Sequence, residues 1–174
     1  MTVVETWDAI RARRNVRSYE DRPIPAEHLD RILEAGWRAP SSMNDQPWDF
    51  VVCTERETLR ELAATWRYSA HVGDSAATIV LVAPDTQDRG ERDWILYDLG
   101  QATMQMMVVA ADLGTGSSHA GIGDQDLARG VLGVPVDRLC VGMVAFGSPA
   151  DRPLRPIAHP DRRARGEVIH RERW

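Results

Sequence analysis

The chain has 174 residues, enough for one domain with a substantial core and too few for two independent domains. Its formal net charge of -5 argues against a nucleic-acid-binding protein, whose surface would be basic. All 21 basic residues are arginine, so chemistry that needs a lysine amine, such as a Schiff base, is excluded. The sequence therefore predicts a single domain over residues 1–174 whose positive charges act locally.

Cysteine content and the first residues bear on metal binding and location. Cys53 and Cys140 each stand inside an apolar run and outside any metal-binding spacing, which predicts buried, reduced thiols. Residues 1–7 lack the basic and apolar regions of a signal peptide, and no apolar run is long enough to span a membrane. We expect a cytoplasmic protein without a metal site and without nucleic-acid or membrane partners.

Apolar residues at helical spacing predict three helices in the first half of the chain. A capping box of the form Thr-x-x-Glu begins at Thr2 and again at Thr54. Between them, Pro25 suits the first turn of a helix that Pro40 must end. The expected elements are helices over residues 3–14, 25–39 and 54–66, with a strand over residues 49–53.

The second half is organised around one long helical pattern over residues 94–113, whose later part, 104–111, is apolar on nearly every side. In so small a domain such a helix lies at the centre or against a second subunit, so we expect a homodimer with this helix near the interface. The polar tail, about residues 150–174, is expected to dock on the partner. Other expected elements are strands over 78–83, 139–146 and 167–170, a flexible glycine-rich loop over 114–123, and a short helix that Asp124 caps.

Two polar segments are candidates for ligand binding. Arg13, Arg14 and Arg17 would share one helix end, where either the helix dipole or a bound phosphate compensates their mutual repulsion. The loop over residues 39–48 offers serine hydroxyls and an asparagine amide, although the same residues suit any tight connection. Together the two segments suit a ligand with a phosphate at one end and a flat, hydrogen-bonding ring at the other.

Histidines are the remaining candidates for acid–base chemistry, because histidine titrates near neutrality. His71 and His119 are the two that we consider as acid, base or ligand; the other three stand in charged or terminal surroundings. Their spacing supports no metal site, and no dinucleotide-binding fingerprint follows a strand. No nucleophile elbow is present either, so hydrolysis is disfavoured.

Taken in order, these residues resemble the FMN-dependent nitroreductase family over nearly the whole chain. The segment Arg13-Arg14-Asn15-Val16-Arg17 is similar to the family's arginine-rich helix end, with asparagine where serine is common. Residues 39–48 closely match the family pattern Ala-Pro-Ser-x-x-Asn-x-Gln-Pro-Trp. Further landmarks lie at residues 110–114, 132–135, 146–149 and 162–163.

The resemblance implies an α+β fold, with a central, mainly antiparallel sheet flanked by helices, in an intertwined homodimer with FMN at the subunit interface. His71, with Arg67 as the alternative, stands where the family often has a lysine or arginine near the flavin's pyrimidine carbonyl. No side chain is required as a catalytic acid or base. The implied cofactor-binding residues are Arg13, Arg14, Asn15 and Arg17; Pro40, Ser41, Ser42 and Asn44 of the second chain; His71, Ala120, Gly121 and Ile122; and Arg162 and Arg163.

The activity that the resemblance implies is ping-pong turnover, in which NADH or NADPH reduces FMN and a nitroaromatic, quinone or similar small molecule then takes two electrons. The short polar link over residues 84–93 predicts an open pocket with loose specificity. Two alternatives stay open: a protein that stores or senses flavin without turnover, and a divergent flavin-cleaving, dehalogenating or dehydrogenating enzyme. A deazaflavin is the alternative cofactor.

Overall fold

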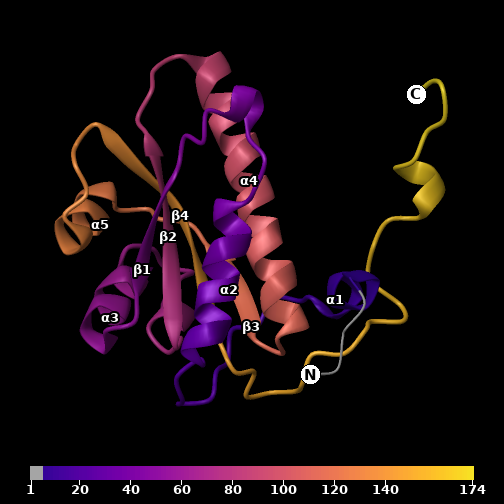
Figure 1. Ribbon diagram of the computed structural model, residues 1–174, viewed down its shortest axis with the longest axis horizontal. Coiled ribbons are helices and arrows are strands. Elements are labelled where there is room, and N and C mark those ends of the chain that lie inside the picture. Colours follow the sequence, from indigo (N-terminus) through magenta and orange to yellow (C-terminus); the bar gives the residue numbers. More distant parts are fainter. Residues whose placement is uncertain (1–5) are drawn as a thin grey trace.

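The computed structural model describes residues 6–174 and contains five α-helices and a four-stranded sheet (Figure 1). The helices are α1 (Thr6–Ala12), α2 (Ala26–Trp37), α3 (Arg56–Ala64), α4 (Arg89–Asp112) and α5 (Gln125–Leu132). The strands are β1 (Asp49–Cys53), β2 (Ala77–Pro84), β3 (Gly116–Ala120) and β4 (Arg138–Gly147). Three short 3-10 helices are η1 (Ser42–Asn44), η2 (Ala70–Val72) and η3 (Arg165–Glu167). The capping box expected at Thr2 lies outside the described residues.

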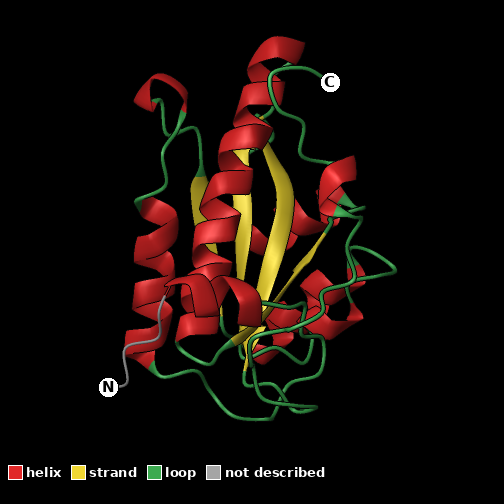
Figure 2. Cartoon of the chain, turned by 90° about the vertical axis from the view of Figure 1, so that its right-hand side faces the viewer, coloured by secondary structure: helices red, strands yellow, loops and turns green. Residues whose placement is uncertain are grey.

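The sheet has the order β1-β2-β4-β3, and every neighbouring pair is antiparallel. Helices α2 and α4 cover one face, and α3 and α5 cover the other, so the sheet lies between two helical layers (Figure 2). Alternate residues of β2 point into these layers: Ile79 and Leu81 pack under α2 and α4, whereas Val80 and Val82 pack under α3 and α5. The expected α+β fold with an antiparallel sheet is confirmed.

Helix caps bear out some of the sequence signals. The Asp124 carboxylate accepts a hydrogen bond from the N–H of Leu127 at 2.9 Å, which confirms the predicted cap of α5. The long helix begins earlier than expected, at Arg89, because Asp88 caps it by accepting from the N–H of Glu91 at 2.9 Å. The cap predicted at Thr54 is wrong, since Glu55 occupies the N-cap position of α3 and makes no side-chain cap bond.

The segment expected to be a flexible glycine-rich loop is instead an ordered edge strand and a tight turn. Residues Gly116–Ala120 form β3, paired along its length with β4. A Cβ added at Gly116 would lie 2.8 Å from the Cβ of Val16, and one at Gly123 would lie 2.8 Å from the Cδ1 of Trp66. Glycine is therefore needed at these two positions for close packing, and the expectation of a flexible segment is wrong.

The arginine cluster does not form a helix end. Helix α1 ends at Ala12, and the chain then runs beside β3, where the N–H of Val16 donates to the carbonyl of Ser117 at 2.9 Å. Val16 is buried, with 1% of its surface exposed, so its packing against Gly116 stabilises this extended path. The expectation that Arg13 and Arg17 share a helix face is therefore wrong.

The tail leaves the body of the molecule past α1 (Figure 1). Two backbone hydrogen bonds hold its first part, from the N–H of Ala150 to the carbonyl of Ser18 and from that of Ile157 to the carbonyl of Arg11, each 3.0 Å long. Residues 155–174 are all exposed. The strand predicted over residues 167–170 is wrong, because this part contains only η3.

Candidate functional site

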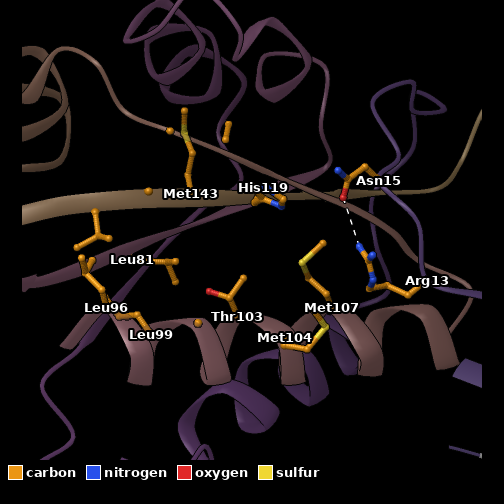
Figure 3. A pocket seen from close by; sticks show the side chains of 15 residues that line it. Arg13, Asn15, Leu81, Leu96, Leu99, Thr103, Met104, Met107, His119 and Met143 are labelled. Carbon is orange, nitrogen blue, oxygen red and sulfur yellow. Dashed lines mark hydrogen bonds between the residues drawn. The ribbon is translucent and has the colours of Figure 1, made fainter. Parts of the chain in front are cut away.

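A cleft of about 510 Å³ lies between α4 and the part of the sheet formed by β3 and β4 (Figure 3). Its volume falls within the range of roughly 300–1,000 Å³ that small-molecule sites occupy. Helix α4 supplies a wall of Leu96, Leu99, Met104 and Met107, with the hydroxyl of Thr103 among them. Leu81, Val141 and Met143 give the opposite wall the same apolar character. The walls therefore suit a flat, apolar ring.

The polar groups of the cleft gather at one end. Arg13 carries the single permanent charge among the described residues that line it, and no lining residue is acidic. The Nη1 of Arg13 donates to the Oδ1 of Asn15 at 3.3 Å, which orients both side chains at the mouth of the cleft (Figure 3). An anionic group is therefore favoured at this end.

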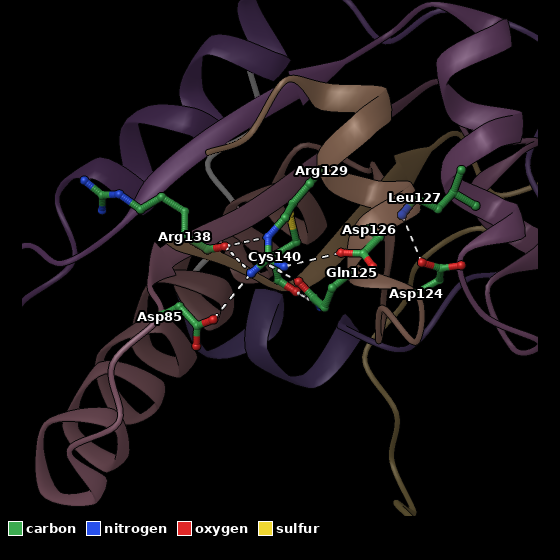
Figure 4. A network of polar contacts seen from close by, with 8 residues as sticks. All are labelled: Asp85, Asp124, Gln125, Asp126, Leu127, Arg129, Arg138 and Cys140. Carbon is green, nitrogen blue, oxygen red and sulfur yellow. Dashed lines mark hydrogen bonds and ion pairs between the residues drawn. The ribbon is translucent and has the colours of Figure 1, made fainter. Parts of the chain in front are cut away.

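The β4 side of the cleft is fixed from behind by α5 (Figure 4). The side chain of Gln125 pairs with both backbone groups of Cys140, donating to its carbonyl at 2.8 Å and accepting from its N–H at 3.0 Å. The next residue, Val141, is skipped in the pairing with β2, where Leu81 opposes Gly142 and Val82 opposes Cys140. This bulge and its support position residues 141–143 against the cleft.

The edge of β3 presents backbone groups to the cleft. The carbonyl of Ser117 points away from β4, because it accepts the hydrogen bond from Val16. Antiparallel pairing alternates, so the N–H and carbonyl of His119 point the same way, and Ala120 and Gly121 continue this edge along the cleft. A ligand bound beside β3 can therefore be held by main-chain hydrogen bonds.

Two buried side-chain atoms near β3 have no hydrogen-bond partner among the described residues: Nε2 of His71 and Oγ of Ser118. Burial lowers the pKa of His71, and the positive charges of Arg17 and His119 lower it further, so its imidazole is neutral at neutral pH. An unpaired buried polar atom costs about 1–3 kcal/mol. Neither His71 nor Ser118 lines the cleft, so these atoms lie outside the candidate site.

The structure brings four of the expected site residues into one cleft, and Arg14, Arg17, His71 and Ile122 do not line it. Arg13, Asn15, Ala120 and Gly121 line the cleft. Arg14 instead donates to the Oδ1 of Asp151 at 3.1 Å and to the carbonyl of Arg152 at 2.7 Å, beside a second hollow of about 480 Å³. The hydrogen bond from Arg14 lowers the pKa of the Asp151 carboxyl. Arg14 therefore anchors the start of the tail.

The proline-serine loop, residues 39–48, does not line the cleft of its own chain. It lies against the N-terminal half of α4, where the N–H of Ser42 donates to the Oδ2 of Asp98 at 2.9 Å. Ser41 accepts a hydrogen bond from the N–H of Gln46 through its Oγ, also at 2.9 Å. Positive φ angles occur at Met43 (51°), Asn44 (62°) and Gln46 (49°). Such strain in non-glycine residues persists where the surroundings enforce it, often at ligand sites. Pro40 and Asn44 are exposed.

The arginines of the tail are also remote from the cleft. Arg162 donates to the carbonyl of Asp161 at 2.6 Å, and Arg163 donates to that of Glu167 at 3.0 Å. Both lie in the exposed arm that leaves the body of the chain (Figure 1). One chain therefore gathers only part of the expected site.

One wall of the cleft was not identified from the sequence, and neither was the direction of the candidate His119. The wall from α4 was read as core or subunit interface, because its apolar residues show helical spacing without a polar face. His119 lines the cleft, but its direction is defined only once β3 is known to be a strand. Residues 116–118 and 120 are buried and only His119 is exposed, so no polar–apolar alternation marks this strand in the sequence.

Thiol chemistry has no place in this site. Cys53 and Cys140 are free and buried, as the sequence predicted. Burial raises the pKa of the Cys53 thiol to about 11 and also raises that of Cys140, so both are protonated at neutral pH. Among residues 6–174, no three potential metal ligands come together, and no helix has both the length and the apolar character needed to cross a membrane.

Comparison with known proteins shows which family this chain resembles in sequence. The model of the Nitroreductase family matches residues 10–66 and 61–148. An Archaeoglobus fulgidus protein provisionally named NADH dehydrogenase/NAD(P)H nitroreductase is 31% identical over 98% of this chain and 99% of its own. A Thermus thermophilus NADH dehydrogenase is 28% identical over 87% of this chain and 90% of its own.

Solved structures give the same fold. An FMN-dependent nitroreductase from Clostridium difficile superposes with a TM-score of 0.82 at 23% identity, covering 95% of this chain and 98% of that chain. The NADPH:FMN oxidoreductase from Vibrio harveyi, complexed with NAD+, superposes with a TM-score of 0.82 at 24% identity, covering 95% of this chain and 76% of that chain. At these identities the likeness shows the fold alone.

Proposed function

The chain belongs to the nitroreductase family, a family of oxidoreductases, and from that premise we propose that it is an FMN-dependent enzyme that takes electrons from NADH or NADPH. Its acceptors are proposed to be nitroaromatics, quinones or similar small molecules, reduced by two electrons in a ping-pong cycle. One observation carries the proposal. The cleft brings Arg13 and Asn15, from the first motif, together with Ala120 and Gly121 at the end of β3.

The residues of the cleft fit FMN in two respects. Apolar side chains of α4 and the sheet suit the two faces of a flavin ring. The outward-facing N–H and carbonyl of His119 suit the hydrogen-bonding edge of the ring. His71 does not line the cleft, so the unpartnered Nε2 of its side chain is not counted among these features. When bound, FMN supplies the hydride and electron transfer, which no side chain here provides.

The protein's part is binding, orientation and electrostatics. Arg13 and Arg17 are proposed to hold the phosphate and the pyrimidine side of the cofactor, and their charges stabilise negative charge that develops on reduction. Asn15 orients Arg13 through their hydrogen bond. Arg14 is proposed to contribute its charge to the phosphate end while anchoring the tail at Asp151. Backbone groups of Ala120, Gly121 and Ile122 are proposed to fix the ring against β3.

We also propose that the enzyme is a homodimer and that each flavin site uses two chains. Pro40, Ser41, Ser42 and Asn44 would reach the cofactor from the second chain, with Arg162 and Arg163 of the docked tail. Several large apolar side chains are exposed in the single chain, and burial against a second chain would remove them from water. They are Trp94 (58%) and Tyr97 (62%) on α4, Trp7 (64%) on α1, and Ile169 (50%) and Trp174 (101%) in the tail.

The test is flavin content followed by turnover. We expect the purified protein to be yellow, to release FMN on denaturation, and to oxidise NADH or NADPH rapidly when a nitroaromatic or quinone is added. Flavin retention without such oxidation would instead indicate a storage or sensing protein. A colourless protein that gains no flavin from added FMN or a deazaflavin would contradict the proposed function outright.

A further inference from the structure

His119 lies in the proposed cofactor cleft, yet the family motif assigns it no part there. It faces the α4 side of the sheet, because it pairs with Val144, whose side chain packs into the core under α4. Figure 3 shows its ring on the sheet side of the cleft, between Met143 and Asn15 and across from Thr103. The side chain is exposed, in contrast to its buried neighbours Ser118 and Ala120. A bound ring in this cleft would therefore lie against the imidazole.

The charges around His119 come from few groups. The segment after α1 brings Arg13, while the residues of α4 and β4 that line the cleft are all uncharged. From the other side of β3, His71 is close enough for the charge of His119 to lower its pKa, as does that of Arg17. Arginine stays protonated, so among the described residues that line the cleft His119 is the side chain with a nitrogen that can accept a proton.

We propose that His119 is a redox-tuning residue: its imidazole lies against the flavin ring and takes up one proton when the ring becomes negatively charged on reduction. This inference rests on the proposed function. A hydride from NADH or NADPH carries two electrons and one proton to the ring and leaves one negative charge there. The second proton comes from solvent and resides on His119. When an acceptor removes the two electrons, both protons leave with them to the reduced product or to solvent.

The proposal predicts how the midpoint potential of the bound flavin depends on pH. For a two-electron couple, a tenfold change in proton concentration shifts the potential by about 30 mV for each proton taken up. Uptake by the ring alone gives a slope of about 30 mV per pH unit, and uptake by the ring together with His119 gives about 60 mV per pH unit. The difference is measurable without any electron acceptor.

The experiment is a spectroelectrochemical titration of the FMN-loaded protein from roughly pH 6 to pH 8, where histidine changes charge. Four proteins are compared: the wild type, His119→Gln, His71→Gln and His28→Gln. Glutamine retains hydrogen-bonding groups but does not titrate. His28 lies on α2 and does not line the cleft, so its replacement is the matched control. Because His119 is exposed, its substitution should leave the fold intact. Circular dichroism of each variant checks this.

We expect the steeper slope in the wild type and in His28→Gln, and a slope lowered by about 30 mV per pH unit in His119→Gln. An unchanged slope in His119→Gln would overturn the inference. Loss of the steep slope in His71→Gln alone would overturn it as well and assign the proton to His71. Both outcomes require bound flavin, so they leave the proposed function standing; failure to bind FMN would instead contradict the proposed function itself.

Discussion

Replacing Arg13 by alanine is expected to weaken FMN binding by about 10- to 100-fold, the equivalent of a lost charge-assisted hydrogen bond of about 1.5–3 kcal/mol. Arg13 carries the permanent charge of the cleft, and its guanidinium is tied to Asn15 rather than to an acidic partner. Its charge is therefore available to the cofactor. Quenching of FMN fluorescence on titration with apoprotein measures the dissociation constant.

Arg60→Ala is the matched control, because Arg60 is an exposed arginine of α3 on the opposite face of the sheet. It removes the same charge from the protein without touching the cleft, so FMN affinity should stay within twofold of the wild type. Equal weakening in both variants would mean that only net charge matters. Unchanged affinity in Arg13→Ala would remove Arg13 from the proposed site.

Replacing Gly116 by alanine is expected to lower the free energy of unfolding by about 1–3 kcal/mol, the usual cost of overpacking a core. The new Cβ would lie 2.8 Å from both the Cβ and the Cγ1 of Val16, which is itself buried. Relief requires movement of the segment that carries Arg13 and Asn15, so FMN affinity should fall as well. Urea unfolding and the fluorescence titration measure the two effects.

Gly130→Ala provides the control for this substitution. A Cβ at Gly130 meets no heavy atom within 4 Å, and the residue lies inside α5. Alanine there should raise the free energy of unfolding by about 0.5–1 kcal/mol through helix propensity. If Gly116→Ala behaved like Gly130→Ala, the close packing of Val16 on β3 would not be needed for stability or for the site.

The elements with strong local signals could be predicted from the sequence. The strand at residues 49–53 was predicted with the bounds it has in the structure, and the strands that became β2 and β4 were found within one or two residues. In β2 the run of isoleucine, valine and leucine is buried on both faces of the sheet and interrupted by no polar residue beyond Thr78. The Asp124 cap was equally clear, because its carboxylate satisfies a backbone N–H locally.

Elements that depend on distant contacts could not be predicted in this way. Strand β3 has the sequence Gly-Ser-Ser-His-Ala, whose residues have low strand propensity, and it forms because β4 pairs with it and Val16 packs beside it. For the same reason the end of α1 was placed too late, since the burial of Val16 draws the chain out of the helix. Tertiary packing overrode local preference at both positions.

For the site, motif order identified Arg13, Asn15, Ala120 and Gly121, which the fold brings to one cleft from segments far apart in sequence. It could not indicate that Arg14 is held by Asp151, nor that His119 points into the cleft. Both depend on chain directions that only the three-dimensional structure defines. The strained loop at Met43, Asn44 and Gln46 was recognised as polar and rigid, but its position beside Asp98 was not foreseeable.

The central claim is that one flavin lies between the arginines of one chain and the proline-serine loop of another. Mixing two variants that each bind FMN weakly tests this claim. Arg13→Ala and Ser41→Ala each damage every site of their own homodimers. In a heterodimer of the two, one site would carry both substitutions and the other would carry neither. At an FMN concentration that leaves both homodimers largely empty, we predict one tightly bound FMN per heterodimer, measured by flavin absorbance after tandem affinity purification of differently tagged chains. A heterodimer as empty as its parents would contradict the claim, because it would mean that Arg13 and Ser41 serve the same flavin from a single chain.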